Sequence, residues 1–304
     1  GWADKLAYAF PNRKIQPHGV AAQIIPWNFP LMMAAWKLAP ALACGNTVVL
    51  KPAEYTPLTA LKLAELIEEA EFPPGVVNII TGGSEAGRAL VEHPDVDKIA
   101  FTGSTEVGKR IQKSLAGTGK PYTLELGGKA AHIIFEDAAI DQAVEGIVNG
   151  IFFNQGHVCC AGSRLLVQEG IAEDVSRRLE HRMQTLVLGD PLDKNTDIGA
   201  INNGEQHQRI QEYLKEAREE GLEVFESDQA LPDCGWWCRP TFVKNVPQSS
   251  RIVREEVFGP VLTIQTFRTP AEAIEKANNT RYGLSGGVWT DKGSKIFKIT
   301  SEVQ

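Results

Sequence analysis

Short β-branched runs alternate with helical patterns through the first half of the sequence, and this alternation constrains the fold more than any other feature. The expected strands cover residues 21–25, 47–50, 76–80, 98–101 and 123–125. The expected helices between them cover residues 31–44, 57–71, 85–92 and 106–115. Strands that are each followed by a helix are typical of right-handed βαβ units. The pattern therefore predicts a parallel sheet with helices on both faces.

Two adjacent glycines in the run Glu125–Lys129 interrupt this pattern, and a second alternation begins after them. Its expected elements are strands at residues 131–135, 164–167, near 223 and 261–267, and helices at 140–153, 173–188 and 204–220. We place a domain boundary after residue 126. The predicted fold class is α/β, with two doubly wound domains, residues 1–126 and 127–304, each built on a mostly parallel sheet.

The composition limits the classes of partner. With 304 residues, 43% of them hydrophobic, the chain can form the cores of two domains. The formal net charge is −7 and basic residues form no stripe, so we expect no nucleic-acid partner. The most apolar stretch, residues 31–50, contains Lys37 and Pro40, so we expect no membrane span within this chain. We expect no metal site.

The cysteines indicate the compartment. There are five, an odd number without regular spacing, so they do not resemble a disulfide framework. We therefore expect a reducing, cytoplasmic location. The sequence begins at Gly1 rather than Met, so we expect missing residues, among which a targeting peptide would not be seen.

The fourth strand–helix junction is a candidate phosphate site. The usual dinucleotide fingerprint, Gly-x-Gly-x-x-Gly after a strand, is absent from every junction. Instead the run FTGSTEVG, residues 101–108, passes through Gly103 and Ser104 into a helix that is expected to begin near Glu106. Free amides at a helix start can hold a phosphate, and Ser104 adds a hydroxyl donor. The alternative is a plain turn between strand and helix.

Polar side chains also follow the first two strands. In IIPWNFP, residues 24–30, the amide of Asn28 can donate to a developing oxyanion, or it can cap the helix that starts at Pro30. In KPAE, residues 51–54, a cation and an anion suited to ribose hydroxyls end the second strand. A solvated loop is the alternative for this second run.

One acid and two cysteines are candidates for chemistry. Glu125 ends the fifth strand beside two glycines, where a carboxylate can be held against water or can form a surface ion pair. Cys159 and Cys160 follow Gly156 at the end of an apolar helix. Free cysteines are usually buried, but this setting also suits a reactive thiolate. The spacing does not select either sulfur.

The chain resembles the NAD-dependent, hydrolytic aldehyde dehydrogenase family, and the resemblance covers its whole length. Six runs occur in the order and approximate spacing of that family: IIPWNFP, KPAE, FTGSTEVG, ELGGK, GHVCCAGSR and EEVFGPV. One such match would be weak, but six ordered matches are specific. The resemblance implies two Rossmann-like domains, with residues 1–126 binding NAD and residues 127–304 carrying the catalytic thiol.

The resemblance also implies a role for individual residues. The implied catalytic residues are Cys159 as nucleophile, Glu125 as general base, Asn28 as oxyanion donor and Lys37 as proton relay, although Lys37 can also simply extend its amine to water. The implied cofactor-binding residues are Ile24, Ile25, Trp27, Lys51, Glu54, Gly103, Ser104, Glu256 and Phe258. The implied substrate tunnel is lined by Phe29, Met33, Trp36 and Phe153, for which core packing is the alternative.

The implied reaction is oxidation of an aldehyde to the carboxylic acid with NAD, through a thiohemiacetal and a thioester on Cys159. NADP is disfavoured because Glu54 would repel an added phosphate. The alternative is a catalytically silent member of the family that serves as a scaffold or binding module.

Three features depart from the family pattern. His157 stands where the family usually has Gln or Glu, and it either alters the pKa of the thiol or is a harmless polar substitution. Residues 6–16 lead to the first strand by a shorter path than the family's hairpin, so residues 1–17 are expected to be a shortened oligomerisation and bridging segment. We expect the chain to lack both ends of the family's sequence, and the full-length protein to be a homodimer or homotetramer.

Overall fold

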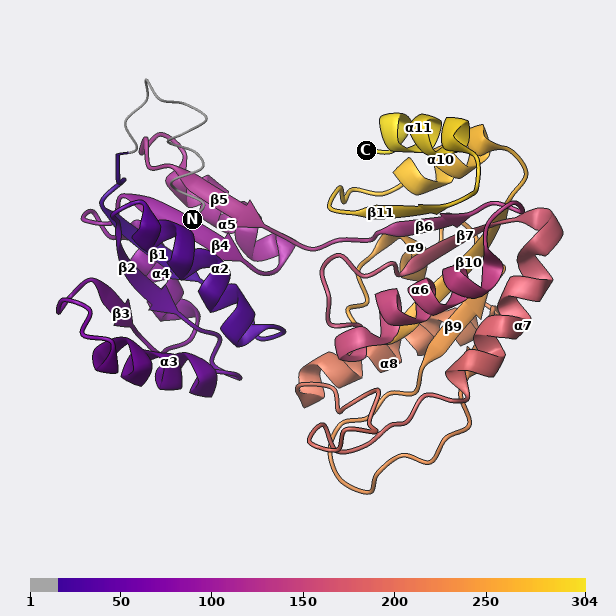
Figure 1. Cartoon of the computed structure of the whole chain (residues 1–304), viewed down its shortest axis with the longest axis horizontal. Helices are drawn as coiled ribbons and strands as arrows, with labels where there is room; N and C mark the ends of the chain where they lie inside the picture. Colours follow the sequence, from indigo (N-terminus) through magenta and orange to yellow (C-terminus); the bar gives the residue numbers. More distant parts are fainter. Residues whose placement is uncertain (1–15) are drawn as a thin grey trace. The chain divides into compact units, whose positions relative to one another are not determined.

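The computed structural model describes residues 16–304, so the prediction for residues 6–16 falls almost wholly outside the described part. Clustering of contacts divides the chain after Leu126 into two compact units, which are considered separately (Figure 1). We refer to residues 16–126 as unit 1 and to residues 127–304 as unit 2. The division falls beside the two glycines of the Glu125–Lys129 run.

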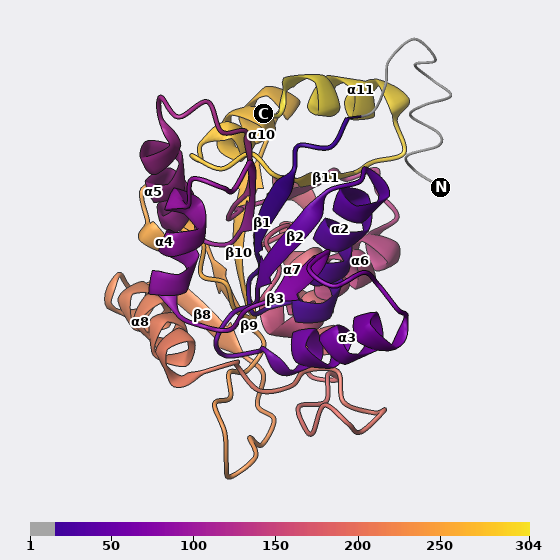
Figure 2. The ribbon, with the colours of Figure 1, turned by 90° about the vertical axis from the view of Figure 1, so that its left-hand side faces the viewer.

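Unit 1 is a five-stranded parallel sheet in the order β3-β2-β1-β4-β5. Its strands are β1 (Val20–Ile24), β2 (Thr47–Lys51), β3 (Val77–Ile79), β4 (Lys98–Thr102) and β5 (Tyr122–Glu125). Its helices are α2 (Pro30–Ala43), α3 (Leu58–Glu69), α4 (Ser84–Glu92) and α5 (Thr105–Leu115). Figure 2 shows α2 and α3 on one side of the strands and α4 and α5 on the other. The predicted doubly wound parallel sheet is confirmed.

The sheet of unit 1 changes winding direction between β1 and β4. The chain moves outward from β1 through β2 to β3, and then returns to place β4 on the other side of β1. Separate apolar clusters fill the two faces, one around Ile99 and Phe101 and one around Val48 and Leu50. In open parallel sheets, ligands bind outside the carboxyl ends of the strands at such a switch point. The loops after β1 and β4 flank this point.

Unit 2 is a six-stranded sheet in the order β11-β6-β7-β10-β9-β8, parallel except for the β8–β9 pair. Its strands are β6 (Ala131–Ile134), β7 (Arg164–Gln168), β8 (Glu223–Glu226), β9 (Thr241–Lys244), β10 (Val261–Phe267) and β11 (Gly286–Trp289). Its α-helices are α6 (Ile140–Phe152), α7 (Ala172–Met183), α8 (Gly204–Glu219), α9 (Arg251–Arg254), α10 (Pro270–Asn278) and α11 (Gly293–Glu302). The mostly parallel α/β prediction is confirmed. The sequence analysis missed β9, β11, α9 and α10, and α7 ends five residues before the predicted end of its helix at residue 188.

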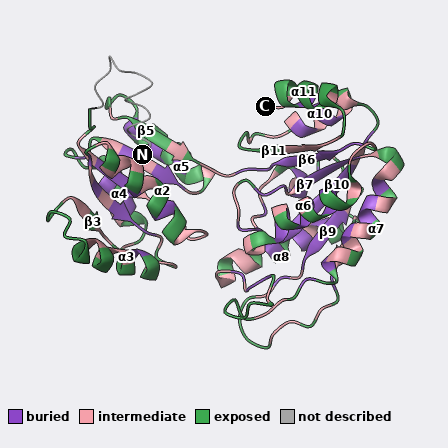
Figure 3. Ribbon diagram, in the orientation of Figure 1, coloured by how far each residue is buried: buried purple, intermediate pink, exposed green. Residues whose placement is uncertain are grey.

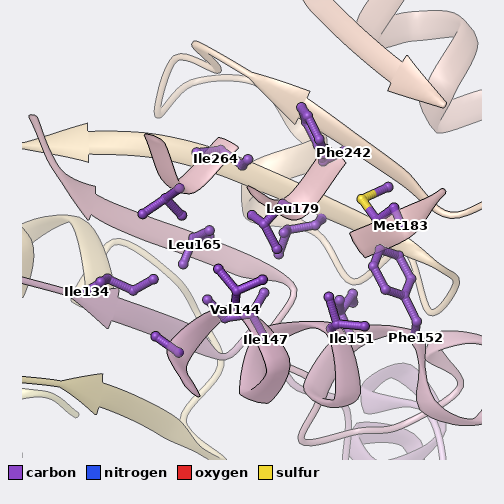
Figure 4. Close-up of a cluster of buried hydrophobic side chains, with 14 of the residues drawn as sticks. Ile134, Val144, Ile147, Ile151, Phe152, Leu165, Leu179, Met183, Phe242 and Ile264 are labelled. Atoms are coloured by element: carbon purple, nitrogen blue, oxygen red, sulfur yellow. The ribbon is translucent and has the colours of Figure 1, made fainter. Parts of the chain in front are cut away.

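The core of unit 2 fixes the helix that leads to the cysteines. One face of α6 contributes Val144, Ile147 and Ile151 to a buried cluster with Leu165 of β7 and Leu179 of α7 (Figure 4). Figure 3 shows the central strands almost entirely buried beneath the helices. Because the apolar face of α6 is packed in this core, the position of α6 is fixed. The start of the following segment, residues 153–160, is therefore fixed as well. None of the helices within residues 16–304 is long and apolar enough to cross a membrane.

Candidate functional site

The loop after β1 carries the first group of candidate residues. Ile24 is the last residue of β1, Ile25 is buried, and Trp27 and Asn28 are half-buried in the turn before α2. The capping position of α2 is held by Phe29, with Pro30 in its first turn, so Asn28 does not occupy that position. Asn28 lies one residue before the capping position.

Lys51 and Glu54 form a pair at the carboxyl end of β2. Lys51 is only 5% exposed, and its Nζ donates to the carbonyl of Pro52 at 2.9 Å and lies 4.0 Å from Oε2 of Glu54. Burial lowers the pKa of Lys51, while Glu54 opposes that shift. The Glu54 carboxylate is exposed. The exposed Glu54 fits the alternative of a solvated loop, whereas the buried Lys51 does not.

The junction after β4 presents Ser104 at the start of α5. Ser104 is the N-cap, and its Oγ accepts a hydrogen bond from the backbone N–H of Val107 at 3.3 Å. Gly103 approaches Phe101 so closely that a Cβ added to it would overlap that ring. The hydroxyl thus has a structural role as a helix cap. The helix begins at the carboxyl end of β4, where the first amides of a helix are available to bind a phosphate.

Glu125 ends β5, directly beside Thr102 of β4 in the parallel register. Within its own unit the Glu125 side chain is exposed, because β5 is an edge strand. Lys37 of α2 interacts electrostatically with Glu125, which raises the pKa of the lysine, but burial lowers it by more and Lys98 adds to the lowering. The structure thus brings Glu125 and Lys37 into one electrostatic neighbourhood.

The four apolar candidates differ in burial. Met33 is 6% exposed and packs in the core cluster of unit 1, and Phe29 packs partly against the same cluster. Core packing therefore accounts for Met33. Trp36 of α2 is 64% exposed and Phe153 of unit 2 is 63% exposed, so core packing does not account for these two.

Cys159 lies in a loop that follows a short segment of left-handed backbone. After α6, Asn154, Gln155 and Gly156 all have left-handed conformations, with φ of 49°, 56° and 73°. At Gly156 a Cβ would overlap the carbonyl group of Gly259, so the two turns pack backbone against backbone. A side chain at position 156 would separate them. Cys159 itself is half-buried, whereas Cys160 is exposed.

The environment of Cys159 keeps its thiol protonated. Burial is the largest influence and raises the pKa of Cys159, and the charges of Cys160 and Glu256 raise it further. The nearby backbone N–H groups of Cys160 and Cys159 favour the charged sulfur and oppose this shift. Burial therefore favours the neutral thiol of Cys159 over the thiolate.

Removing the charge of Glu256 should make Cys159 more reactive. Because the carboxylate raises the pKa of the thiol, Glu256→Gln should lower that pKa and increase the thiolate fraction at pH 7. We expect alkylation of Cys159 by iodoacetamide to accelerate on the order of threefold at pH 7, with the difference disappearing at high pH. Tandem mass spectrometry separates Cys159 from Cys160. The control is Glu205→Gln, which removes an exposed carboxylate. Equal alkylation rates in both variants would refute the electrostatic coupling between Glu256 and Cys159.

Glu256 is held by the glycine turn that begins unit 2. Its Oε1 accepts a hydrogen bond from the backbone N–H of Gly128 at 3.1 Å. Burial raises the pKa of Glu256, and the Gly128 N–H and the charges of Lys129 and Arg209 oppose that shift. A Cβ on Gly127 would overlap the Glu256 carboxylate, and one on Gly128 would overlap the carbonyl oxygen of Cys159. The two glycines thus let the nucleophile loop and the acid approach one backbone turn.

We expect Gly128→Ala to disrupt the loop of Cys159. The new methyl group would overlap a backbone oxygen, which cannot move without shifting the loop, so a loss of about 1–3 kcal/mol in unfolding free energy should follow. Thermal unfolding and the alkylation rate of Cys159 measure the two effects. Gly170→Ala is the matched control, because a Cβ there would meet no atom within 4 Å. Equal stability of both variants would contradict the close packing at Gly128.

The turn carrying Glu256 and Phe258 is supported by residues that the sequence analysis did not identify. Gln206 of α8 donates from Nε2 to the carbonyls of Val257 and Phe258, at 3.0 and 2.8 Å. Arg209, one turn further along α8, donates to the carbonyl of Glu256 at 3.0 Å. These residues lie about fifty positions before the turn, and no local pattern marks them.

Within each unit the candidate residues gather at one place. In unit 1 they lie at the carboxyl ends of β1, β2, β4 and β5 and on the first turns of α2. In unit 2, Gly128, Gly156, Glu256 and Phe258 line one small cavity beside the cysteine loop. These features define a class of α/β protein. In one unit, candidate ligand-binding residues lie at the carboxyl ends of the strands, where the winding direction of the sheet changes. In the other unit, a loop carries a candidate nucleophilic thiol.

The chain belongs to the aldehyde dehydrogenase family, whose sequence model matches residues 7–304. It is 48% identical to retinal dehydrogenase 2 of Homo sapiens and 46% identical to an aldehyde dehydrogenase of Davidiella tassiana, covering 100% of this chain and 61% and 63% of those proteins. It also superimposes on betaine aldehyde dehydrogenase from Staphylococcus aureus, solved in complex with NAD+, with a TM-score of 0.91 and 41% identity over 94% of this chain and 58% of that one. The chain thus spans about three fifths of the length of these relatives.

Proposed function

We propose that this chain carries the cofactor-binding and catalytic core of an enzyme that oxidises an aldehyde to the carboxylic acid with NAD. The observation that carries the proposal is Cys159, a free and partly accessible thiol on a loop that is held where Gly156 packs against the backbone of Gly259. A partly accessible thiol on a fixed loop suits attack on a carbonyl. Membership of the aldehyde dehydrogenase family supports the same reaction.

The residues present fit a dinucleotide. Lys51 and Glu54 pair at the end of β2, where they would hold the adenosine ribose, beside Ile24, Ile25 and Trp27 after β1. Gly103, Ser104 and the first amides of α5 would hold the pyrophosphate, and Glu256 with Phe258 would hold the nicotinamide riboside. The exposed carboxylate of Glu54 favours ribose hydroxyls over an added phosphate, and therefore NAD over NADP.

In the proposed reaction, the thiol of Cys159 first loses its proton to water. The sulfur then bonds to the aldehyde carbon, and the electron pair of the carbon–oxygen double bond moves to the oxygen, which becomes an oxyanion. The side-chain amide of Asn28 and the backbone N–H of Cys159 stabilise that oxyanion, a donor of this kind contributing about 3 kcal/mol. When bound, NAD supplies the acceptor for the hydride that leaves the same carbon. Cys159 then carries a thioester. Glu125 takes a proton from water, the resulting hydroxide adds to the thioester, and the carbon–sulfur bond breaks to release the acid.

The proposed substrate carries an apolar chain or ring near the carbonyl. Trp36 and Phe153 are exposed aromatic side chains on elements that bear catalytic candidates, and Phe29 is half-buried next to Asn28. A relative of this chain is named retinal dehydrogenase 2, a name that denotes an apolar aldehyde. Lys37, next to Trp36 and coupled to Glu125, is proposed to relay the proton that Glu125 takes up.

The experiment is to incubate the intact protein with NAD and a panel of aliphatic and aromatic aldehydes, and to follow the absorbance of reduced nicotinamide. We expect turnover that Cys159→Ala abolishes, and Cys160→Ala should retain it, because Cys160 serves as the matched control. If the intact protein gives no more signal than Cys159→Ala, the enzyme proposal fails and the silent scaffold takes its place. If Cys160→Ala is the inactive variant, the nucleophile has been misassigned.

A further inference from the structure

The turn at residues 256–258 has a backbone that needs support. Phe258 has φ of 57°, in the left-handed region that bulky side chains rarely adopt. Such a residue persists only where its surroundings determine its conformation, and these residues often occur at functional sites. Gln206 and Arg209 hold the carbonyls of the turn from the side of α8. They do not contact the aromatic ring itself through any of these bonds.

The ring of Phe258 is supported by His157. The two rings stack with centroids 5.7 Å apart and planes inclined by 30°. His157 is only 2% exposed, and its backbone N–H donates to the carbonyl of Asn154 at 2.9 Å, which holds the backbone of His157 at the end of the left-handed turn. At Gly156, the backbone before His157 packs against Gly259, the residue after Phe258. The nucleophile loop and the 256–258 turn therefore meet through backbone and ring together.

The histidine is a neutral ring in this place. Burial lowers the pKa of His157 to about 4, so at neutral pH no charge enters the stack. The neutral ring of His157 stacks on the ring of Phe258.

We propose that His157 is a positioning residue for the dinucleotide, which acts by stacking on Phe258 and so keeps the Glu256–Phe258 turn shaped to hold the nicotinamide riboside. The inference rests on the proposed function, in which Glu256 and Phe258 grip that end of NAD. A glutamine at position 157 has no ring and cannot make this stack. The chain's departure from the family pattern at this position thus gives the turn a support of its own.

The test compares the binding of NAD with that of ADP, which lacks the nicotinamide riboside. Isothermal titration calorimetry gives the dissociation constants of the intact protein and of His157→Gln, His157→Phe and His207→Gln. We expect His157→Gln to bind NAD about threefold to tenfold more weakly, the worth of one aromatic pair, and to bind ADP as before. His157→Phe keeps a ring and should restore the affinity for NAD. In steady-state kinetics, the KM for NAD should rise more than the KM for the aldehyde.

The control histidine has the same kind of contact elsewhere. The ring of His207 contacts that of Trp236 with centroids 5.6 Å apart and planes tilted by 36°, so His207→Gln removes a histidine ring contact outside the 256–258 turn. It should bind both NAD and ADP as the unmodified protein does. Equal affinity of His157→Gln and the unmodified protein for NAD would overturn the inference, as would an equal loss for NAD and ADP. If the unmodified protein binds no NAD, the proposed function fails first, and the two failures are thereby distinguished.

Discussion

Replacing Glu125 by glutamine is expected to lower the steady-state rate of aldehyde oxidation by about 10²–10⁴-fold, the contribution of a positioned general base. The first turnover should survive, because bond formation to Cys159 and hydride transfer precede the step in which Glu125 takes a proton from water. Stopped-flow measurement of reduced nicotinamide should therefore show a burst of about one equivalent per active chain, followed by almost no turnover.

Two variants serve as controls for this experiment. Cys159→Ala should show neither burst nor turnover, because no thioester can form. Glu106→Gln should behave as the unmodified protein, because Glu106 is an exposed acid of the same unit that pairs with Arg110 on the surface of α5. A Glu125→Gln variant with undiminished turnover would mean that another group activates the water. Loss of the burst as well would move Glu125 to the step in which Cys159 is deprotonated.

The fold of unit 1 could be predicted because most of its strands lie in short apolar runs between glycine, proline or polar residues. The same reasoning failed for β11, where Gly286 and Gly287 remove the apolar pattern and the strand exists only because β6 pairs with it. The helix α10 did carry a local signal that the sequence analysis overlooked. Thr269 caps it by accepting from the N–H of Glu272 at 3.2 Å, and Pro270 occupies its first turn.

The residues of the candidate site could also be predicted only in part. Sequence runs marked Asn28, Lys51, Ser104 and Cys159 because each lies at the end of an element, where a local pattern is visible. The supports of these residues come from distant parts of the chain. Gln206 reaches the Glu256–Phe258 turn across fifty residues, and the pKa of Cys159 depends on how deeply the loop is buried. Such quantities follow from tertiary packing, which no single run of sequence contains.

Arg164 shows how a buried cation links the glycine turn to the rest of unit 2. It begins β7, is 2% exposed, and donates three hydrogen bonds to backbone carbonyls: to Lys129 at 2.8 Å, Lys276 at 2.9 Å and Ala277 at 2.7 Å. The first of these carbonyls follows directly on Gly128, whose N–H holds Glu256. The other two belong to the last turn of α10.

Arg164→Met is therefore expected to destabilise unit 2 by about 2–4 kcal/mol. Two buried carbonyls and one part-buried carbonyl would lose their donor, at a cost of about 1–3 kcal/mol for each buried one before relaxation. Relief of the buried charge acts in the opposite direction. Burial lowers the pKa of Arg164 to about 10, so removing the charge offsets part of this loss. Differential scanning calorimetry should show a lower unfolding temperature.

The location of the effect distinguishes this account from a general loss of stability. Hydrogen exchange should quicken first at the end of α10 and at the start of β6, because Arg164 joins these two segments. Arg177→Met, which removes an exposed arginine of α7 paired only on the surface with Asp174, should change the stability by less than about 0.5 kcal/mol. Arg164→Lys keeps the charge but not the planar fork of donors, so it should be destabilised as well. Full stability of Arg164→Lys would mean that the charge, and not the three hydrogen bonds, holds the glycine turn in place.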